Sequence, residues 1–154
     1  MTTSIEATSQ GIENQQRELE FASQGLLGFE NLKRYSLSAY DPQTPFYWLR
    51  SIEDPELAFI VMEPRFLVED YGFDLPDEIA TELEIQTSES AFVLVLLTIP
   101  EDITRISANL AAPLIFNRQS NRGRQVVLEA AQYPLRLPIF PEVPSEIASE
   151  SENA

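Results

Sequence analysis

Acidic clusters are the groups in this sequence whose residue types and spacing could do chemistry. One cluster, residues 53–56, holds three carboxylates around Pro55, and a second consists of Glu69 and Asp70. Two carboxylates can hydrolyse a glycosidic bond if they face each other across a sugar cleft. A hard-cation site would instead need regularly spaced oxygen ligands around a glycine turn, and neither cluster has that spacing. We therefore interpret both clusters as solvated carboxylates at turns, with Asp54 starting the turn at Pro55.

Histidine and cysteine are both absent from the 154 residues. Histidine is the usual general base near neutral pH, and these two residue types supply most zinc ligands. Ser-His and Cys-His catalysis, disulfides and ordinary zinc sites are therefore excluded. The sequence favours a binding protein, with no cofactor and no metal, over an enzyme. A carboxylate-dependent hydrolase that uses Asp54 and Glu56 is the alternative that stays open.

Charge is unevenly distributed along the chain, whose formal net charge is -15. Residues 41–102 carry fifteen acidic residues against two basic ones, whereas residues 103–140 carry five arginines and one glutamate. An acidic surface attracts basic partners and repels nucleic acid and anionic membranes, although such a surplus can also serve solubility alone. A nucleic-acid module built on Arg118, Arg122 and Arg124 is a third hypothesis, which the overall charge disfavours.

The sequence lacks the marks of a membrane or exported protein. No apolar run reaches the roughly 18 residues needed to cross a bilayer, and no signal peptide is visible. We therefore expect a cytoplasmic protein without membrane contact. The length suits one domain. We expect residues 1–16 to be a disordered lead-in, residues 17–140 the domain, and residues 141–154 a disordered acidic tail.

Short β-type runs separated by turn residues dominate the central region. Alternating or continuous apolar patterns predict strands at 17–22, 34–40, 46–52, 58–62, 91–99, 103–110, 113–117 and 125–128. Residues 76–83 begin with proline and acidic residues and place Ile79 and Leu83 four apart, which predicts one short amphipathic helix. Residues 120–124 (SNRGR) predict a hairpin turn. Together these elements predict a mainly β fold, a small closed or nearly closed antiparallel β-barrel.

Three consecutive aromatic residues, Phe46, Tyr47 and Trp48, stand inside one of these predicted strands. Side chains alternate between the two faces of a strand, so at least one aromatic must point away from its neighbours. An aromatic on an uncovered face would mark a contact patch, whereas one shielded by a loop would belong to the core. The sequence leaves both interpretations open.

The ordered motifs resemble the FliW family of flagellar assembly factors along nearly the whole predicted domain. The similar segments are GLLGFE (25–30), TPFYWLRSIEDPELAFIVMEP (44–64), AFVLVLLTIP (91–100), ANLAAPLIFN (108–117) and RGRQVVL (122–128). The last two are the most specific, and the order of all five strengthens the resemblance. The polar lead-in and the acidic tail depart from the family pattern and are given no family role.

The resemblance implies a small β-barrel-like fold without catalytic activity and two alternative protein partners, flagellin and the RNA-binding translational regulator CsrA. In the family, the protein sequesters CsrA, which otherwise represses flagellin translation, and free flagellin recaptures the protein. Flagellin ends are amphipathic helices, which need an apolar groove with a polar rim. We expect the contact surface at aromatic and acidic positions of loops and strand edges: Phe46, Trp48, Asp54, Glu56, Glu69, Asp70, Tyr71 and Phe73.

Overall fold

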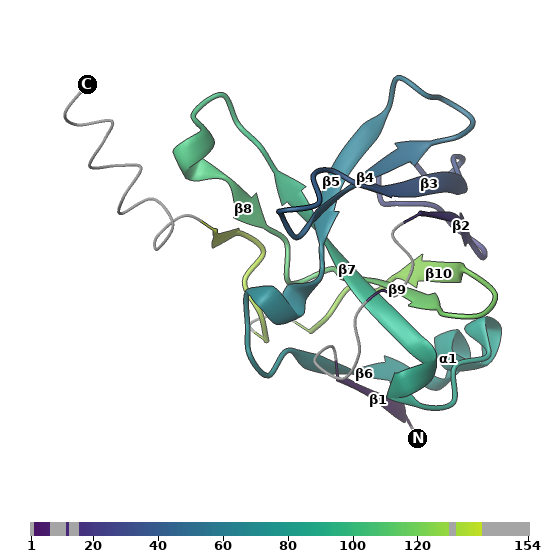
Figure 1. Ribbon diagram of the computed structural model, residues 1–154. Helices are drawn as coiled ribbons and strands as arrows, with labels where there is room; N and C mark the ends of the chain where they lie inside the picture. Colours follow the sequence, from purple (N-terminus) through teal and green to yellow (C-terminus); the bar gives the residue numbers. More distant parts are fainter. Residues whose placement is uncertain (1, 7–11, 13–15, 130–131, 140–154) are drawn as a thin grey trace.

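A barrel wall and a smaller second layer make up the fold (Figure 1). The computed structural model describes residues 2–6, 12, 16–129 and 132–139. Its strands are β1 (Thr2–Glu6), β2 (Arg17–Phe21), β3 (Arg34–Ala39), β4 (Phe46–Ser51), β5 (Ala58–Met62), β6 (Gly72–Pro76), β7 (Ala91–Thr98), β8 (Ser107–Ala108), β9 (Leu114–Asn117), β10 (Arg122–Gln125) and β11 (Leu137–Pro138). Its helical segments are α1 (Asp77–Leu83) and the 3-10 turns η1 (Pro64–Phe66), η2 (Ser88–Ser90) and η3 (Ile103–Arg105). No helix within these described residues is long and apolar enough to cross a membrane.

Seven strands close the barrel in the order β7, β5, β4, β3, β2, β10 and β9, because β9 also pairs with β7. Neighbouring strands in this ring are antiparallel except for β2 and β10, which pair in parallel with Glu20 opposite Arg122. β8 and β11 extend the sheet beyond β7. The predicted fold class, a mainly β closed barrel with one short α-helix, is confirmed, and the parallel pair is its one departure from antiparallel order.

The barrel interior is filled by side chains that alternate along the wall strands. On β4, Leu49 and Ser51 point inward and are buried, as the two-residue period of a strand requires. β10 can approach the ring of Phe116 closely because Gly123 has no side chain; a Cβ at that position would lie 2.2 Å from Cδ1 of Phe116. The inner cluster consists of Leu19, Phe21, Leu26, Tyr35, Leu37, Leu49, Val61, Phe92, Leu94, Leu114 and Phe116.

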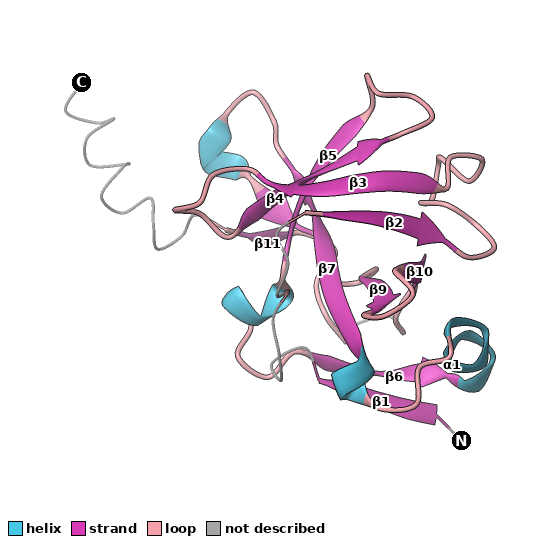
Figure 2. Cartoon of the chain, turned by 45° about the vertical axis from the view of Figure 1, so that its right-hand side comes forward, coloured by secondary structure: helices cyan, strands magenta, loops and turns pink. Residues whose placement is uncertain are grey.

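β7 is buried on both faces along most of its length, which explains its continuous apolar sequence AFVLVLLT. Phe92 and Leu94 point into the barrel, while Ala91, Val93 and Val95 point outward into a second core. The two-stranded sheet β1–β6 and α1 lie against this side of the barrel in both views (Figures 1 and 2). We call β1, β6 and α1 together the cover.

Part of the predicted disordered lead-in is a strand. β1 pairs antiparallel with β6, with Ile5 opposite Phe73, and Ile5 is 1% exposed within the second core. The prediction for residues 1–16 is therefore wrong at residues 2–6, because a partner strand and one buried isoleucine order a segment of polar composition. The remaining lead-in residues 1, 7–11 and 13–15 and the predicted tail 141–154 lie outside the described residues.

The other differences from the predicted elements concern short segments. The predicted strand 103–110 is instead η3 followed by the two-residue β8. The cause is local, since Asp102 Oδ1 accepts hydrogen bonds from the amide and hydroxyl of Thr104 (3.0 and 2.6 Å) and stabilises a turn. The β9–β10 turn precedes residue 122 and includes Asn121 at φ 62°, so β10 starts inside the predicted turn and ends at Gln125. β6 and β11 have no counterpart among the predicted strands.

Candidate binding surface

Two aromatic side chains of β4 point away from the barrel interior. Because Leu49 points inward, Phe46, Trp48 and Arg50 share the outer face of the strand. Tyr40, directly after β3, joins them: its ring centroid lies 5.5 Å from that of Trp48 and 6.3 Å from that of Phe46. The amide of Tyr40 also donates to the Phe46 carbonyl oxygen (2.9 Å). We call Tyr40, Phe46, Trp48 and Arg50 the aromatic face.

The aromatic face keeps contact with water. Tyr40 is 50% exposed, Phe46 and Trp48 are half-buried, and the Arg50 guanidinium lies 5.6 Å from the Trp48 ring centroid. Tyr47, the middle of the three consecutive aromatics, packs against the inner cluster instead. The strand alternation thus places one aromatic inside and two outside. The exposed ring surface can accept apolar side chains of a partner.

The predicted acidic contact residues lie in two separate segments. Asp54 and Glu56 are exposed in the turn between β4 and β5, where the amide of Asp54 donates to Ser51 Oγ (2.9 Å). Glu69 and Asp70 are exposed between η1 and β6, beyond the opposite end of β5. Four residue steps along β5 separate those ends by about 13 Å, at ~3.3 Å per residue. The structure therefore does not join the two pairs into one acidic cluster.

The turn between β4 and β5 is fixed to the barrel wall by two charged side chains. Glu53 Oε1 accepts hydrogen bonds from the amides of Lys33 (2.7 Å) and Arg34 (3.1 Å) at the start of β3. These bonds, that from Arg34 first, lower the pKa of the Glu53 carboxyl below its ordinary value. From the other side, the guanidinium of Arg50 donates to the Pro55 carbonyl oxygen (2.8 Å). The first acidic cluster therefore has a structural anchor beside its exposed carboxylates.

Tyr71 and Phe73, which were expected to contact a partner, are core residues. They are 1% and 4% exposed, and the Tyr71 hydroxyl donates to the Leu110 carbonyl oxygen (2.6 Å). Burial raises the pKa of the Tyr71 hydroxyl. The expectation is wrong for these two positions because Tyr71, Phe73 and Leu75 alternate along the segment and all point into the second core. That alternation is a signal that the sequence itself contains.

Arginines of the β9–β10 hairpin make contacts within the chain. Arg124 forms an ion pair with Glu82 of α1 (2.7 Å). The Arg118 Nε donates to the Glu89 carbonyl oxygen (3.0 Å), and its guanidinium lies 5.9 Å from the Phe92 ring centroid. These contacts fasten the hairpin to neighbouring elements and weaken the case for a phosphate-binding role.

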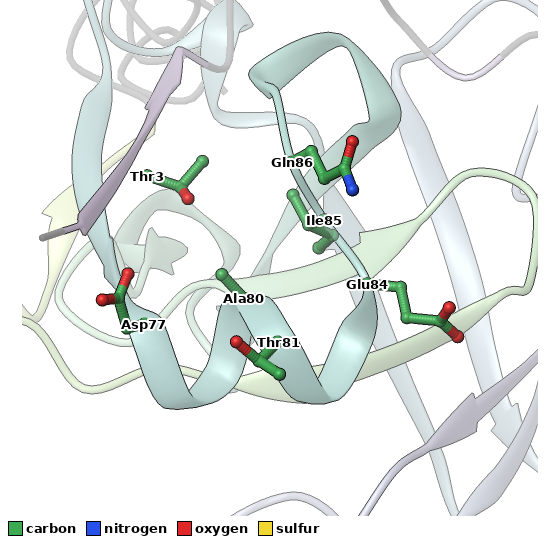
Figure 3. Close-up of a pocket in the computed structure, with 7 residues that line it drawn as sticks. All are labelled: Thr3, Asp77, Ala80, Thr81, Glu84, Ile85 and Gln86. Carbon is green, nitrogen blue, oxygen red and sulfur yellow. The ribbon is translucent and has the colours of Figure 1, made fainter.

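Two surface pockets lie away from the aromatic face. One, of about 460 Å³, lies between β1 and α1 (Figure 3), and the other, of about 560 Å³, lies between the end of β7 and β11. Neither is lined by Asp54 or Glu56, the carboxylates on which the hydrolase hypothesis depends. Within the described parts of the chain, no group of three or more acidic, histidine or cysteine side chains could hold a metal ion.

A closed seven-stranded barrel with a partial second layer and an exposed aromatic face defines a small β-barrel protein suited to contacts with other proteins. The family model described as FliW protein matches residues 3–139, and the chain belongs to this family of flagellar assembly factors. The match begins inside β1, so the lead-in, which the resemblance had left outside the family pattern, lies partly within it.

Similar proteins agree with this assignment. The chain is 40% identical over 136 residues to the flagellar assembly factor FliW of Caldicellulosiruptor saccharolyticus, covering 88% of this chain and 89% of that protein. It is 37% identical over 126 residues to the protein of the same name from Ruminiclostridium cellulolyticum, covering 81% and 84%. A crystal structure of the flagellar assembly factor FliW superposes with a TM-score of 0.72 at 30% sequence identity, covering 90% of this chain and 98% of that one.

Proposed function

We propose that this protein binds flagellin and, in alternation with it, sequesters a CsrA-type RNA-binding regulator in the cytoplasm. Through this exchange it couples flagellin synthesis to filament assembly, and it acts by binding, without catalysis or cofactor. Family membership supports the role in flagellar assembly. The observation that carries the binding proposal is the aromatic face, a group of rings that stays partly exposed on the barrel wall.

The aromatic face has the features that an amphipathic helix needs. Tyr40, Phe46 and Trp48 supply apolar ring surface, and Arg50 supplies a polar boundary on the same side of β4. Helix-in-groove recognition places apolar anchors at helical spacing on such a floor and leaves charges at its rim. Aromatic residues at the centre of an interface contribute the largest share of its binding energy. We therefore assign the flagellin contact to this face, with Trp48 at its centre.

The acidic residues suit the second partner. A CsrA-type protein is expected to be basic where it binds RNA, and Asp54, Glu56, Glu69 and Asp70 are all exposed. Opposite charges accelerate encounter more than they increase final affinity. The pairs lie in two segments rather than one, so the attraction comes from a broad acidic surface. This predicts an association rate that falls with rising salt.

Calorimetric titration with flagellin and with CsrA from the same organism tests the proposal. We expect saturable binding of each and competition between them. Trp48→Ala is expected to weaken flagellin binding by roughly 30-fold, about 2 kcal/mol. The matched control is Leu27→Ala, which removes an apolar side chain that is 56% exposed on the loop between β2 and β3, and should leave binding unchanged.

Failure to bind either protein at tens of micromolar would overturn the proposal as a whole. Equal losses in Trp48→Ala and Leu27→Ala would reject the aromatic face while leaving partner binding intact. The charge argument is tested separately by stopped-flow association of CsrA with an Asp54→Asn, Glu56→Gln double variant. An association rate that is changed neither by the two substitutions nor by the ionic strength would reject steering by the acidic surface.

A further inference from the structure

Arg50 is a cation without a carboxylate partner in an acidic part of the chain. Its side chain is exposed on the outer face of β4, and the turn that follows contains Glu53, Asp54 and Glu56. Within the described part of the chain Arg50 nevertheless forms no ion pair. The Glu53 carboxylate accepts hydrogen bonds from two main-chain amides of β3 and its approach instead. The positive charge of Arg50 is therefore available to a partner.

Two contacts hold the Arg50 guanidinium in place. Its Nη1 donates to the Pro55 carbonyl oxygen (2.8 Å), and the group lies 5.6 Å from the Trp48 ring centroid. A guanidinium has several N–H donors, and the described residues provide an acceptor for a single one. The other N–H groups can donate to a carboxylate in the paired, planar geometry that arginine favours. Because the side chain is already ordered, a partner that binds it loses less conformational entropy.

The aromatic face forms three rows along β4. Tyr40 lies beside Phe46 in the first row, Trp48 stands in the second, and Arg50 stands in the third. Successive rows are two residues apart on the strand, which is about 6.6 Å at ~3.3 Å per residue. Phe46 is half-buried against the second core, so Tyr40 supplies most of the exposed ring surface of the first row. From the start of β4 to its end, the rows are apolar, apolar and cationic.

The neighbours of the second and third rows are short side chains. Ser38 of β3 lies opposite Trp48, and Ser36 of β3 and Ala58 of β5 lie opposite Arg50. All three are half-buried and point outward, because the residues next to them along each strand point into the barrel. A segment laid along β4 can therefore contact Trp48 and Arg50 without a clash against bulky side chains at these positions.

An α-helix has the spacing that the three rows require. Four residues of a helix rise about 6 Å, and residues four apart lie on one face. Side chains at positions i, i+4 and i+8 of a helix along β4 therefore meet the rows in turn. An extended segment has a similar spacing but finds no main-chain partner there, because the amides and carbonyls of β4 pair with β3 and β5. A helix satisfies its own main chain and is the better occupant.

The acidic turn sets the direction of such a helix. Asp54 and Glu56 are exposed in the turn at the Arg50 end of β4. The N-terminus of a helix carries a partial positive charge and its C-terminus a partial negative one. The N-terminus is therefore favoured beside the turn, and an acidic residue in the first helical turn is stabilised by the same dipole. The helix runs antiparallel to β4, with its acidic residue first.

We propose that the docking segment of flagellin is a helix antiparallel to β4, with an acidic residue that pairs with Arg50. An apolar residue four positions later contacts Trp48, and a second one four positions further contacts Tyr40. This pattern rests on the assignment of the flagellin contact to the aromatic face, and it makes Arg50 the residue that sets register and direction. A basic residue at the first position would be repelled, and an apolar one would desolvate Arg50 without compensation.

The test uses the whole protein and an alanine-rich peptide of about twenty residues, long enough to be helical alone. The peptide carries glutamate, leucine and leucine four residues apart in that order, and amide NMR follows the titration. We expect saturable shifts at Ser38 and Trp48. Arg50→Glu should weaken binding roughly tenfold, and the peptide with arginine in place of glutamate should regain it. The matched control Arg136→Glu makes the same charge change at an exposed arginine before β11 and should bind like wild type.

The peptide experiment has two internal controls. Regained binding in the charge-swapped pair excludes a fold defect in Arg50→Glu. The peptide with its three residues in reverse order has the same composition and should bind several-fold more weakly. No saturable shift at millimolar peptide, equal binding of the two orders, or equal binding by wild type and Arg50→Glu overturns the proposal.

Calorimetry with flagellin separates this pattern from the proposed function. Arg50→Glu should weaken flagellin binding roughly tenfold and leave CsrA binding intact. Flagellin that binds wild type and Arg50→Glu equally would overturn the helix pattern and leave the proposed function standing. Flagellin that does not bind the wild-type protein, while the peptide binds as expected, would overturn the proposed function but support the helix pattern. Loss of CsrA binding alone would assign the face to that partner and overturn the proposal.

Discussion

Two outer walls of the same barrel differ in what lies on top of them. The outer face of β7 is covered by β1, β6 and α1, so Val93 and Val95 are at most 3% exposed. Among the described residues no such layer covers the outer face of β4 at Trp48, which remains half-buried beside the exposed Tyr40, whereas Phe46 packs against the edge of the second core. Apolar residues thus face outward on both walls. What decides whether they serve stability or recognition is the presence of a covering layer, and not the composition of the strand.

The cover is held in place by polar bonds as well as by apolar packing. Asn117 of β9 bonds to the end of α1, Arg124 of β10 pairs with Glu82 of α1, and Tyr71 bonds to Leu110. The bonds from Asn117 to Leu83 and from Tyr71 to Leu110 are buried, whereas the Arg124–Glu82 pair is partly exposed. Buried hydrogen bonds specify one arrangement because leaving either partner unsatisfied is costly. The outer face of β4 holds no described layer in place, so its residues can be substituted without disturbing the packing of a second layer.

An aspartate placed on each wall should give the largest difference in the free energy of unfolding between the two walls. Val93→Asp buries a carboxylate in the second core and should lower the free energy of unfolding by more than about 4 kcal/mol. Trp48→Asp places the same group on the uncovered wall and should change it by less than about 1 kcal/mol. Urea denaturation followed by circular dichroism measures both. Similar losses in the two variants would show that the aromatic face is part of the core after all.

Removing the side chain of Asn117 should give the next largest loss of stability. Its amide nitrogen donates to two carbonyl oxygens at the end of α1 (2.8 and 3.2 Å), and its oxygen accepts from two amides of the β9–β10 turn (2.8 and 3.2 Å). Asn117→Ala leaves buried groups unsatisfied and should cost about 2–3 kcal/mol. Asn109→Ala is the control, because Asn109 makes one such bond, to the Ala111 amide (3.0 Å), and should cost about 1 kcal/mol. A reversed order in thermal denaturation would contradict the role of Asn117 as the fastener of the cover.

The two cores contain buried tyrosines that differ in hydrogen bonding. Tyr71 in the second core donates to Leu110, whereas the Tyr35 hydroxyl in the barrel interior is buried without a hydrogen-bond partner. Tyr71→Phe should therefore destabilise the fold by about 1–2 kcal/mol, while Tyr35→Phe should be neutral or slightly stabilising. Chemical denaturation of the two variants, which lose the same atom, measures the difference directly. Equal destabilisation would mean that the Tyr35 hydroxyl has a partner.

The two buried tyrosines should make the stability of the fold fall at alkaline pH, which exposed tyrosines would not do. They should have no effect on stability at neutral pH. Burial first, and the Glu53 charge second, raise the pKa of Tyr35 from 10.0 to about 12, and burial raises that of Tyr71 as well. The folded state holds protons that the unfolded state releases near pH 10. Stability should therefore be unaffected below pH 10 and fall between about pH 10 and 12. Denaturation midpoints across this range test the sign, and a smaller fall in Tyr35→Phe is the control.

The barrel wall could be predicted from the sequence because its strands carry their own signals. β3, β4, β5, β7 and β9 have alternating or continuous apolar patterns bounded by turn residues, and each lies within one residue or two of its predicted range. β1 and β11 could not be predicted in this way. A polar five-residue segment with one isoleucine is a strand only because β6 lies beside it, and no local pattern records that partner.

The exposure of the residues expected to contact a partner was predicted in part. Phe46 and Trp48 do lie on the outer wall, since alternation around the inward Leu49 fixes their side. Tyr71 and Phe73 were misplaced because aromatics in an acidic stretch were interpreted as exposed, although their two-residue spacing is that of a buried strand. Tyr40 was not selected at all, because its place on the face depends on a contact across two strands.

The parallel pairing of β2 with β10 has a consequence for the order of events in folding. Glu20 lies opposite Arg122 in this pair. One edge of β2 therefore stays unpaired during synthesis until β10, about a hundred residues later in the chain, has been made. Contacts so distant in sequence form slowly. Until β10 arrives, β2 and β9 expose unpaired edges that invite association with other chains. A nascent or truncated chain that ends before residue 122 should therefore be prone to aggregate. Pairing of β10 with β2 and β9 closes the ring and removes the unpaired edges that cause this aggregation.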